Sequence, residues 1–214
     1  RARLTARISR SKWKQLKENA PANGVTPSVL LLTKFTEVLR TQTESKRFSL
    51  VLTMVNRPPI HKDIERVVGH LISTTIFLPS PSSELSFVEQ AQKNQKQLWA
   101  DLEHGAVSAI RVLRELRSAK SLPDGFVLPV VFTSMLGVAD FKQENGFDER
   151  LIDSANSTPQ IYLDHQVWEI NEELVLSWDI APDRIDLEFS ASLFEQYKTA
   201  LESEAAGDST TSNA

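Results

Sequence analysis

The side chains best suited to chemistry stand in two strand-like segments, one ending in Thr133 and Ser134 and the other containing Asp164, His165 and Gln166. A carboxylate on a rigid strand keeps a fixed distance from a substrate and can transfer protons. The Thr133 hydroxyl could hold that carboxylate, or an oxygen of a reaction intermediate, in place. Successive strand residues point to opposite faces, so Asp164 and His165 should not pair directly, and His165 is interpreted as a hydrogen-bonded structural histidine.

Each of these residues also has a purely structural explanation. Asp164 could be a cross-strand hydrogen-bonding aspartate, and Thr133 could be present for its β propensity alone. Gln166 and Asn56, which follows a buried strand, could bind substrate or serve the local structure, and the sequence does not choose between these roles. The other histidines lack metal-ligand spacing, and neither a P-loop nor a G-x-G-x-x-G motif is present, so no metal or nucleotide site is expected.

Composition narrows the class of protein. A length of 214 residues fits one domain with a sizeable core, and a net charge of −4 argues against a general nucleic-acid-binding protein. The chain has no cysteine, which excludes disulfides and thiolate sites and fits a cytoplasmic protein. No apolar run approaches the ~20 residues that cross a bilayer, so no membrane partner is expected. A start at Arg1, without Met, suggests an excised fragment.

The N-terminal segment is basic, because its charged residues before Glu18 are all cations: Arg1, Arg3, Arg7, Arg10, Lys12, Lys14 and Lys17. Such a segment could be a basic arm for an anionic partner. The alternative, a solvated strand edge and helix face, is the more common situation.

Hydrophobic periodicity predicts alternating strands and helices. Strands are expected at 4–8, 48–55, 72–78, 127–134, 160–169 and 173–180, with a hairpin at 170–172. Helices are expected after Ser9 or Ser11, after the N-cap Thr26, after the capping box at Ser86 (with Ala91, Leu98 and Leu102 facing inward), at 106–119 and at 186–204. A loop at 142–157 and a disordered tail at 205–214 complete the chain. This order predicts an α/β sandwich with a mixed sheet, forming one unit over residues 1–204.

Several segments, taken in order, resemble the motifs of heterocyclization (Cy) domains of nonribosomal peptide synthetases, a branch of the condensation-domain superfamily. The segment 157–166, STPQIYLDHQ, resembles the family signature TPQVWLDHQ. The other matching segments are 24–31 with 35–39, 48–61, 67–69, and 129–134, which reads PVVFTS. One departure is His70, which stands where the family has an aspartate after glycine.

The resemblance implies a chloramphenicol-acetyltransferase-like fold, a two-layer sandwich that forms one lobe of a two-lobed condensation-type domain. All matching motifs belong to the C-terminal lobe of that domain. The N-terminal lobe carries a D-x-x-x-x-D motif; Asp148 and Asp153 have that spacing, but they follow PVVFTS and are interpreted as a coincidence. The chain is therefore expected to be half of an enzyme domain and inactive without its partner lobe.

The family's activity is to join a carrier-bound acyl or peptidyl thioester to carrier-bound Cys, Ser or Thr, and then to cyclodehydrate the product to a thiazoline or oxazoline. The resemblance implies catalytic roles for Asp164 and Thr133, and substrate-binding or supporting roles for Asn56, Gln166 and Ser134. It implies no cofactor bound by this chain, because the substrates are carried on phosphopantetheine.

The expected partners are upstream and downstream peptidyl carrier proteins and the N-terminal lobe, with Arg57 as a weaker candidate for carrier docking. Three alternatives stay open at this point. The chain could be a non-catalytic lobe that docks carrier proteins, or a plain amide-forming condensation lobe. An ordinary acyltransferase is a third possibility, although the H-H-x-x-x-D-G motif with its catalytic histidine is absent.

Overall fold

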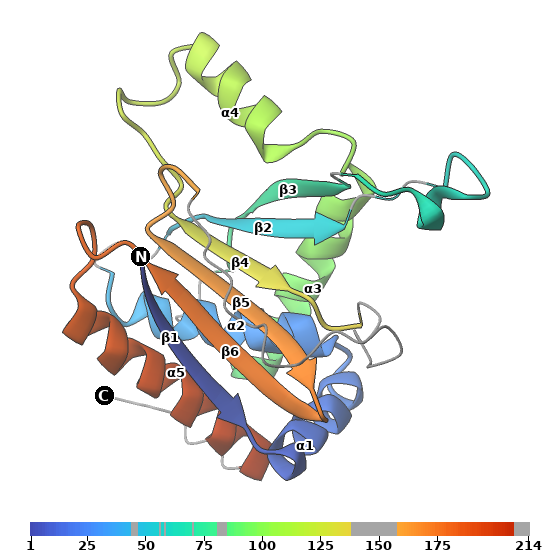
Figure 1. Ribbon diagram of the computed structural model, residues 1–214, viewed down its shortest axis with the longest axis vertical. Helices are drawn as coiled ribbons and strands as arrows, with labels where there is room; N and C mark the ends of the chain where they lie inside the picture. Colours follow the sequence, from blue (N-terminus) through green and yellow to red (C-terminus); the bar gives the residue numbers. More distant parts are fainter. Residues whose placement is uncertain are drawn as a thin grey trace.

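The computed structural model describes residues 1–43, 47–55, 57, 59–69, 71–80, 85–137 and 158–207. Within them, six strands form one mixed sheet in the order β1-β6-β5-β4-β2-β3 (Figure 1). Their bounds are β1 (Ala2–Ile8), β2 (Leu50–Val55), β3 (Ile72–Phe77), β4 (Val130–Ser134), β5 (Leu163–Ile170) and β6 (Glu173–Ile180). The pairs β2–β4 and β4–β5 are parallel, whereas β1–β6, β5–β6 and β2–β3 are antiparallel. The predicted mixed sheet is confirmed.

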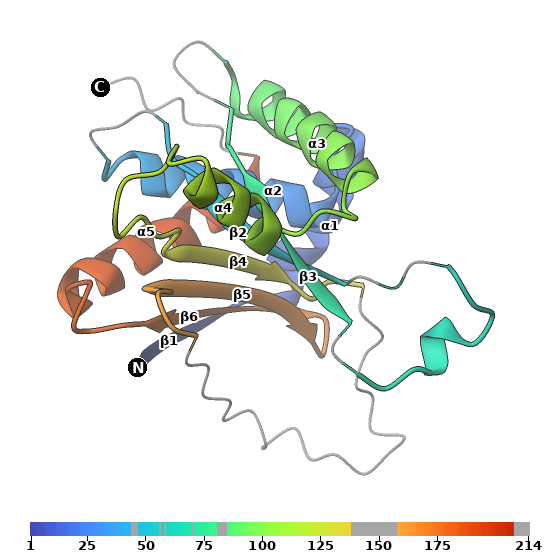
Figure 2. The same cartoon turned by 90° about the horizontal axis from the view of Figure 1, so that it is seen from above.

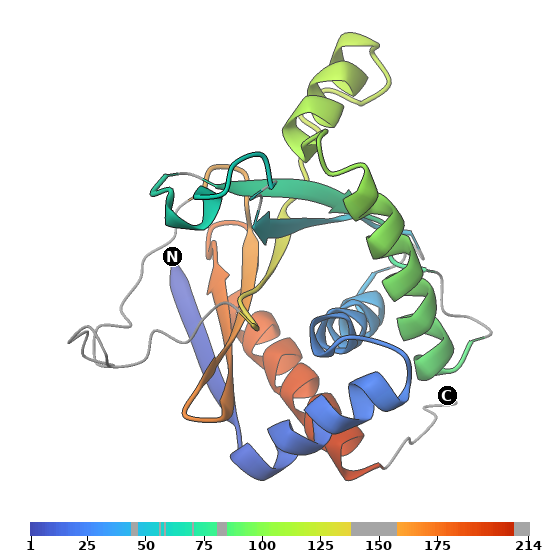
Figure 3. The same ribbon diagram turned by 90° about the vertical axis from the view of Figure 1, so that its right-hand side faces the viewer.

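The helices gather on one side of this sheet. Their bounds are α1 (Arg10–Ala22), α2 (Pro27–Arg40), α3 (Phe87–Glu103), α4 (Ala109–Ser118) and α5 (Leu187–Ala206), with a short 3-10 helix η1 (Ile64–Arg66). Helices α1, α2 and α5 cover one face of the sheet, and α3 packs beside α2 (Figure 3). Helix α4 contacts β3 at the edge of the sheet (Figure 2). The helix layer therefore leaves the other face of the sheet to the site described below.

Local sequence signals explain where several elements begin and end. Thr26 caps α2 by accepting a hydrogen bond from the backbone N–H of Val29, with Pro27 at the first helical position. Ser86 and Glu89 form the predicted capping box of α3. The β5–β6 connection has only two residues, Asn171 and Glu172, both with positive φ, which is the geometry of a type I′ turn.

Helix α3 corrects one prediction. Leu102, expected to face inward, is 43% exposed, while Gln90, Asn94 and Gln95 are buried. These amides hydrogen-bond to specific groups: the Asn94 side chain accepts from the Ser80 N–H and donates to the Thr33 hydroxyl, and Gln95 accepts from the Thr26 N–H. Ala91 is buried and Leu98 packs against the core as predicted, so the inner face of α3 combines apolar residues with hydrogen-bonded amides.

The cations of the basic N-terminal segment form ion pairs with acids of the same chain. Residues of β1 pair with β6, since Arg3 binds Asp179 and Arg7 binds Glu173. The cations that follow also meet acids: Arg10 meets Glu172, Lys12 meets Glu202, Lys14 meets Glu18 and Lys17 meets Glu169. The structure thus favours the strand-edge and helix-face interpretation over a free basic arm.

The C-terminal helix extends slightly further than predicted. Helix α5 runs to Ala206 and ends at Gly207 in the left-handed conformation, and Ala205 is buried in the core. The predicted tail from 208 onward, the predicted loop at 142–157, Asp148 and Asp153, and His70 all lie outside the described residues. None of the helices in the described ranges has the length and apolar content that crossing a lipid bilayer requires.

Candidate functional site

The two faces of β5 have different neighbours, and Asp164 lies on the face opposite the helices. His165, in register with Phe132 of β4 and Trp178 of β6, points toward the helix layer, where its ring meets Phe35 of α2. Because strand residues alternate, Asp164 and Gln166 project from the other face. Asp164 is nevertheless only 6% exposed.

His165 is a core residue, as the sequence predicted. Its ring lies 4.7–5.9 Å, between centroids, from the rings of Phe35, Phe132, Tyr197 and Trp178. Its Nδ1 is 3.2 Å from the backbone oxygen of Ser177. Burial lowers the pKa of His165 to about 3, which keeps the ring neutral. It is therefore a structural residue.

Gln166 holds the Asp164 carboxylate. Its Nε2 donates a hydrogen bond of 3.0 Å to Oδ2 of Asp164, two residues earlier on the same face of β5. The sequence left the role of Gln166 open between substrate binding and structure, and the observed contact is a supporting one. A donor fixed to one carboxylate oxygen restricts the rotation of the group.

Thr133 lies on the same face, on the neighbouring parallel strand. It is in register with Gln166, while Val131 is in register with Asp164. Thr133 and Asp164 are therefore diagonal neighbours, and strand geometry places their Cα atoms about 8 Å apart. The cross-strand row that contains Thr133 is polar on all six strands: it runs through Thr5, Ser177, Gln166, Thr133, Thr53 and Thr74.

Ser134 is directed the other way. It is in register with Val167, a buried residue, and its Oγ lies 2.8 Å from Oγ of Ser28 in the first turn of α2. This contact ties β4 to α2 on the helix side of the sheet. Thr133 and Ser134, adjacent in the PVVFTS segment, are thus separated by the sheet itself, and the contact seen for Ser134 is a supporting one.

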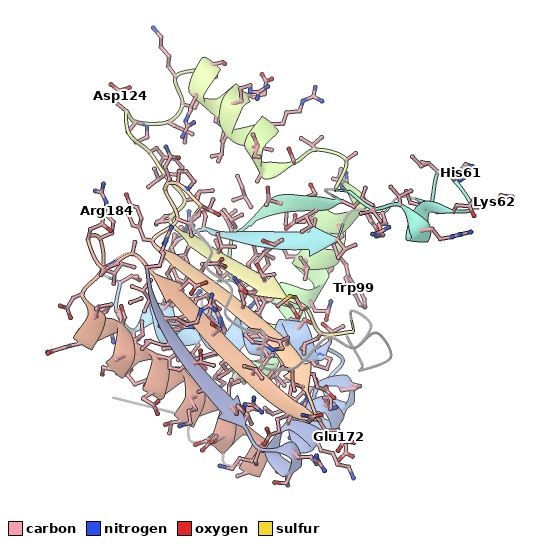
Figure 4. The ribbon with its side chains drawn as sticks, viewed as in Figure 1. His61, Lys62, Trp99, Asp124, Glu172 and Arg184 are labelled. Atoms are coloured by element: carbon pink, nitrogen blue, oxygen red, sulfur yellow. The ribbon has the colours of Figure 1, made fainter. Side chains whose placement is uncertain are left out.

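The other two predicted site residues lie at the segment that follows β2. Asn56 falls outside the described residues. The Arg57 guanidinium donates through Nη1 to the backbone oxygens of Ile64 and Val67, at 2.6 and 3.2 Å. It thereby closes a projecting loop whose far end carries His61 and Lys62 (Figure 4). Arg57 has a structural task, and its docking role stays a prediction.

Sequence reasoning missed Asp179 and Arg3. Asp179 faces Asp164 directly across the β5–β6 pair and is 3% exposed. Both of its oxygens accept hydrogen bonds from Arg3 of β1, each 2.7 Å long. The available signal was the position of Asp179, a charged residue within a largely apolar strand. Its relation to Asp164 could not be inferred without knowing which strands pair. Within the described ranges, no cluster of three or more acidic or imidazole side chains could hold a metal ion.

The comparison with protein families decides the affiliation of this chain. The family model described as "Condensation domain" matches residues 1–212. This chain belongs to the condensation-domain family. Its six-stranded mixed sheet with helices on one face is the chloramphenicol-acetyltransferase-like fold that the sequence predicted.

Two synthetases and one solved structure illustrate the similarity of this chain to known proteins. Pyochelin synthetase PchF of Pseudomonas aeruginosa is 30% identical over 82% of this chain and 10% of that protein. Phenyloxazoline synthase MbtB of Mycobacterium tuberculosis is 30% identical over 87% of this chain and 14% of that protein. The cyclization-docking bidomain of the EpoB nonribosomal peptide synthetase from Sorangium cellulosum has a TM-score of 0.78 and 30% identity, covering 95% of this chain and 41% of that structure. This condensation-family chain thus spans a small part of its curated relatives.

Proposed function

We propose that this chain is the catalytic C-terminal lobe of a heterocyclization domain in a nonribosomal peptide synthetase, in the cytoplasm. The observation that carries the proposal is the placement of Asp164: it is nearly buried on the helix-free face, held by Gln166, and diagonal to Thr133. The similarity to a phenyloxazoline synthase and to a cyclization domain supports the same reaction class.

The proposed reaction has two stages. The amine of a carrier-bound Cys, Ser or Thr attacks the upstream thioester carbonyl, an amide forms, and the carrier thiol leaves. The thiol or hydroxyl side chain of the new residue then attacks that amide carbon. Loss of the former carbonyl oxygen as water, together with the amide proton, leaves the C=N bond of a thiazoline or oxazoline.

Asp164 serves the second stage in this proposal. Ring closure requires removal of a proton from the attacking side chain, and water loss requires delivery of a proton to a poor leaving group. One carboxyl that first accepts and then returns a proton meets both needs, and such help accelerates a reaction by roughly 10²–10⁴-fold. Burial and the Gln166 hydrogen bond keep the carboxyl in one orientation during both transfers.

Thr133 would act from the adjacent strand. Its hydroxyl can donate to the oxygen that develops charge in the tetrahedral intermediate, while Asp164 handles the proton. The diagonal spacing of about 8 Å accommodates an intermediate between them. The proposed partners are two peptidyl carrier proteins, which bring the substrates on phosphopantetheine, and the N-terminal lobe that completes the domain.

The test is mass spectrometry of a reconstituted reaction. A two-lobed domain containing this chain is mixed with a carrier-bound donor and a cysteinyl carrier, and the released product is weighed. A wild-type product one water lighter than the linear amide is expected, whereas Asp164→Asn should stop at the amide. Thr133→Val, of nearly the same shape, should slow ring formation while the amide still forms.

Other outcomes would select among the alternatives. A wild-type reaction that ends at the linear amide would identify a plain condensation lobe. Carrier binding without any amide would identify a docking lobe. Normal cyclization by Asp164→Asn would remove Asp164 from the mechanism.

A further inference from the structure

Asp164 has a second carboxyl directly opposite it. The antiparallel β5–β6 register pairs Asp164 with Asp179, so both side chains leave the same face of the sheet. They are 6% and 3% exposed. Directly opposed residues in such a pair have Cβ atoms about 4.5–5.5 Å apart. Two carboxylates at that separation repel each other when both carry a charge.

Arg3 compensates this second carboxyl. The β1–β6 register places Arg3 beside Asp179, and the guanidinium donates through Nε and Nη2 to the two oxygens of Asp179, both at 2.7 Å. This two-pronged geometry is the strongest form of an arginine–carboxylate pair. The three residues Arg3, Asp179 and Asp164 thus lie in one row across three strands.

Among the strand residues that the structure describes, the other charged or titratable groups on this face lie in different rows. Among the described residues, Arg7 and Glu173 pair with each other at the far end of β6, about 20 Å along the strand from Asp179. At the near end, Tyr162 has Arg184 over its ring, and Arg1 donates to the Thr158 carbonyl. On the other flank of Asp164, β4 and β2 present Val131, Thr133, Val51 and Thr53.

We propose that the Arg3–Asp179 pair sets the protonation of Asp164, with both residues acting as positioning residues and neither touching substrate. The negative charge of Asp179 disfavours a negative charge on Asp164. The positive charge of Arg3 partly cancels the charge of Asp179 and so weakens this repulsion. A carboxyl that must accept a proton and then return it works best when neither form is strongly preferred. The catalytic consequence rests on the proposed heterocyclization, whereas the electrostatic coupling does not.

Carboxyl NMR tests the coupling without any catalytic assay. The two-lobed domain is labelled with ¹³C at the aspartate side-chain carboxyls, and the Asp164 resonance is assigned by its loss in Asp164→Asn. Arg3→Met leaves Asp179 uncompensated, so the titration midpoint of Asp164 should rise by about one pH unit. Asp179→Asn leaves the guanidinium to act on Asp164, so the midpoint should fall by a similar amount.

The double variant decides between coupling and simple structural damage. Arg3→Met with Asp179→Asn removes both charges and should return the midpoint to within about 0.3 pH units of wild type. Arg7→Met removes a cation from the same face of β1 and should leave the Asp164 midpoint unchanged. If one single variant fails to fold, the other single variant and the double variant still test the proposal.

The failures are distinguishable. Equal midpoints in all folded variants, or shifts in the same direction for both single variants, would overturn the inference. The pH profile of ring closure, measured on the same proteins, should move with the NMR midpoints. Coupled NMR midpoints in a domain that makes no ring would refute the proposed function and leave the coupling intact. Ring closure with an unmoved NMR midpoint would do the reverse.

Discussion

Asp164 and His165 are neighbours in the chain, yet their side chains leave β5 on opposite faces, one bonded to Gln166 and the other against Phe35. The alternation of a strand therefore separates two polar residues into different environments. His165 is buried among aromatic rings and is kept neutral, while Asp164 lies on the face without helices. The division explains why an aspartate–histidine sequence here does not make an aspartate–histidine pair.

The neutral core histidine predicts an acid-sensitive fold. The pKa of His165 is about 3 in the folded chain and near 6.5 when unfolded, so the unfolded chain binds the proton more tightly between those values. Lowering the pH through that window should cost about 1.4 kcal/mol of unfolding free energy per pH unit from this residue alone. Urea denaturation at pH 4.5 to 7 should show a shallower dependence for His165→Leu than for wild type. Parallel curves would contradict the assignment.

The Gln166 hydrogen bond predicts a selective catalytic defect. A hydrogen bond to a charged group contributes about 1.5–3 kcal/mol, so Gln166→Leu should slow ring closure by roughly tenfold or more. Amide formation should be less affected, because the proposed role of Asp164 is in the second stage. Single-turnover mass spectrometry separates the two rates. Gln196→Leu removes an exposed glutamine of α5 and serves as the control. An equal loss of both rates would argue against a selective role.

Replacing Lys34 should lower the free energy of unfolding, and a second substitution at Glu204 should restore part of it. Lys34 is 8% exposed, its Nζ lies 2.9 Å from Glu37 and 3.3 Å from Glu204, and it covers the Phe87 ring at 3.7 Å. Lys34→Met strands Glu204 in a nearly buried position and should destabilise the fold by about 3 kcal/mol. Adding Glu204→Gln should recover much of that loss in denaturant unfolding. Additive losses would show that Glu204 is not the group left unpaired.

The β5–β6 turn predicts a stabilising substitution. Glu172 has φ of 63°, a conformation that glycine adopts without steric cost. Glu172→Gly relieves the steric cost of a left-handed conformation and should raise stability by about 1 kcal/mol, seen as a higher melting temperature. The ion pair lost with Arg10 is highly exposed and should cost little. Glu188→Gly, placed within helix α5, should lower the melting temperature instead. A lower melting temperature for Glu172→Gly would count against the turn geometry.

If the loop closed by Arg57 contacts the carrier protein, replacing Arg57 should weaken carrier binding. Arg57→Ala removes the donor to the Ile64 and Val67 carbonyls and should weaken carrier binding about fivefold, measured by calorimetry. Lys62→Ala removes a cation at the tip of the same loop without that contact (Figure 4). Equal effects would mean that charge alone matters. Unchanged affinity for Arg57→Ala would exclude the docking role.

The sequence predicted the elements whose signals are local. The Thr26 cap, the Ser86 capping box and the strand alternation around Asp164 each depend on a few consecutive residues. Leu102 was misplaced because hydrophobic periodicity does not show how far along a helix the packing extends: α3 packs Ala91 and Leu98 against the core but not Leu102. Helix α3 also buries amides such as Asn94, whose partners in Ser80 and Thr33 come from other elements.

The candidate site was predictable only in part, for the same reason. Asp164 and Thr133 stood out because their segments resemble family motifs. Asp179 and Arg3 did not, because their relation to Asp164 arises from the pairing of β1 with β6, which join opposite ends of the chain. The strand register that brings Arg3, Asp179 and Asp164 together cannot be inferred from any short stretch of the sequence.

The pairing of β1 with β6 also bears on how the protein is made. Residues 2–8 have their strand partner at residues 174–180, so β1 leaves the ribosome long before β6. Contacts of such long sequence separation form slowly, because the intervening chain must be ordered first. During synthesis β1 therefore stays without this partner strand until β6 has emerged. A nascent chain halted before β6 would lack the partner of Arg3 and the strand that faces Asp164.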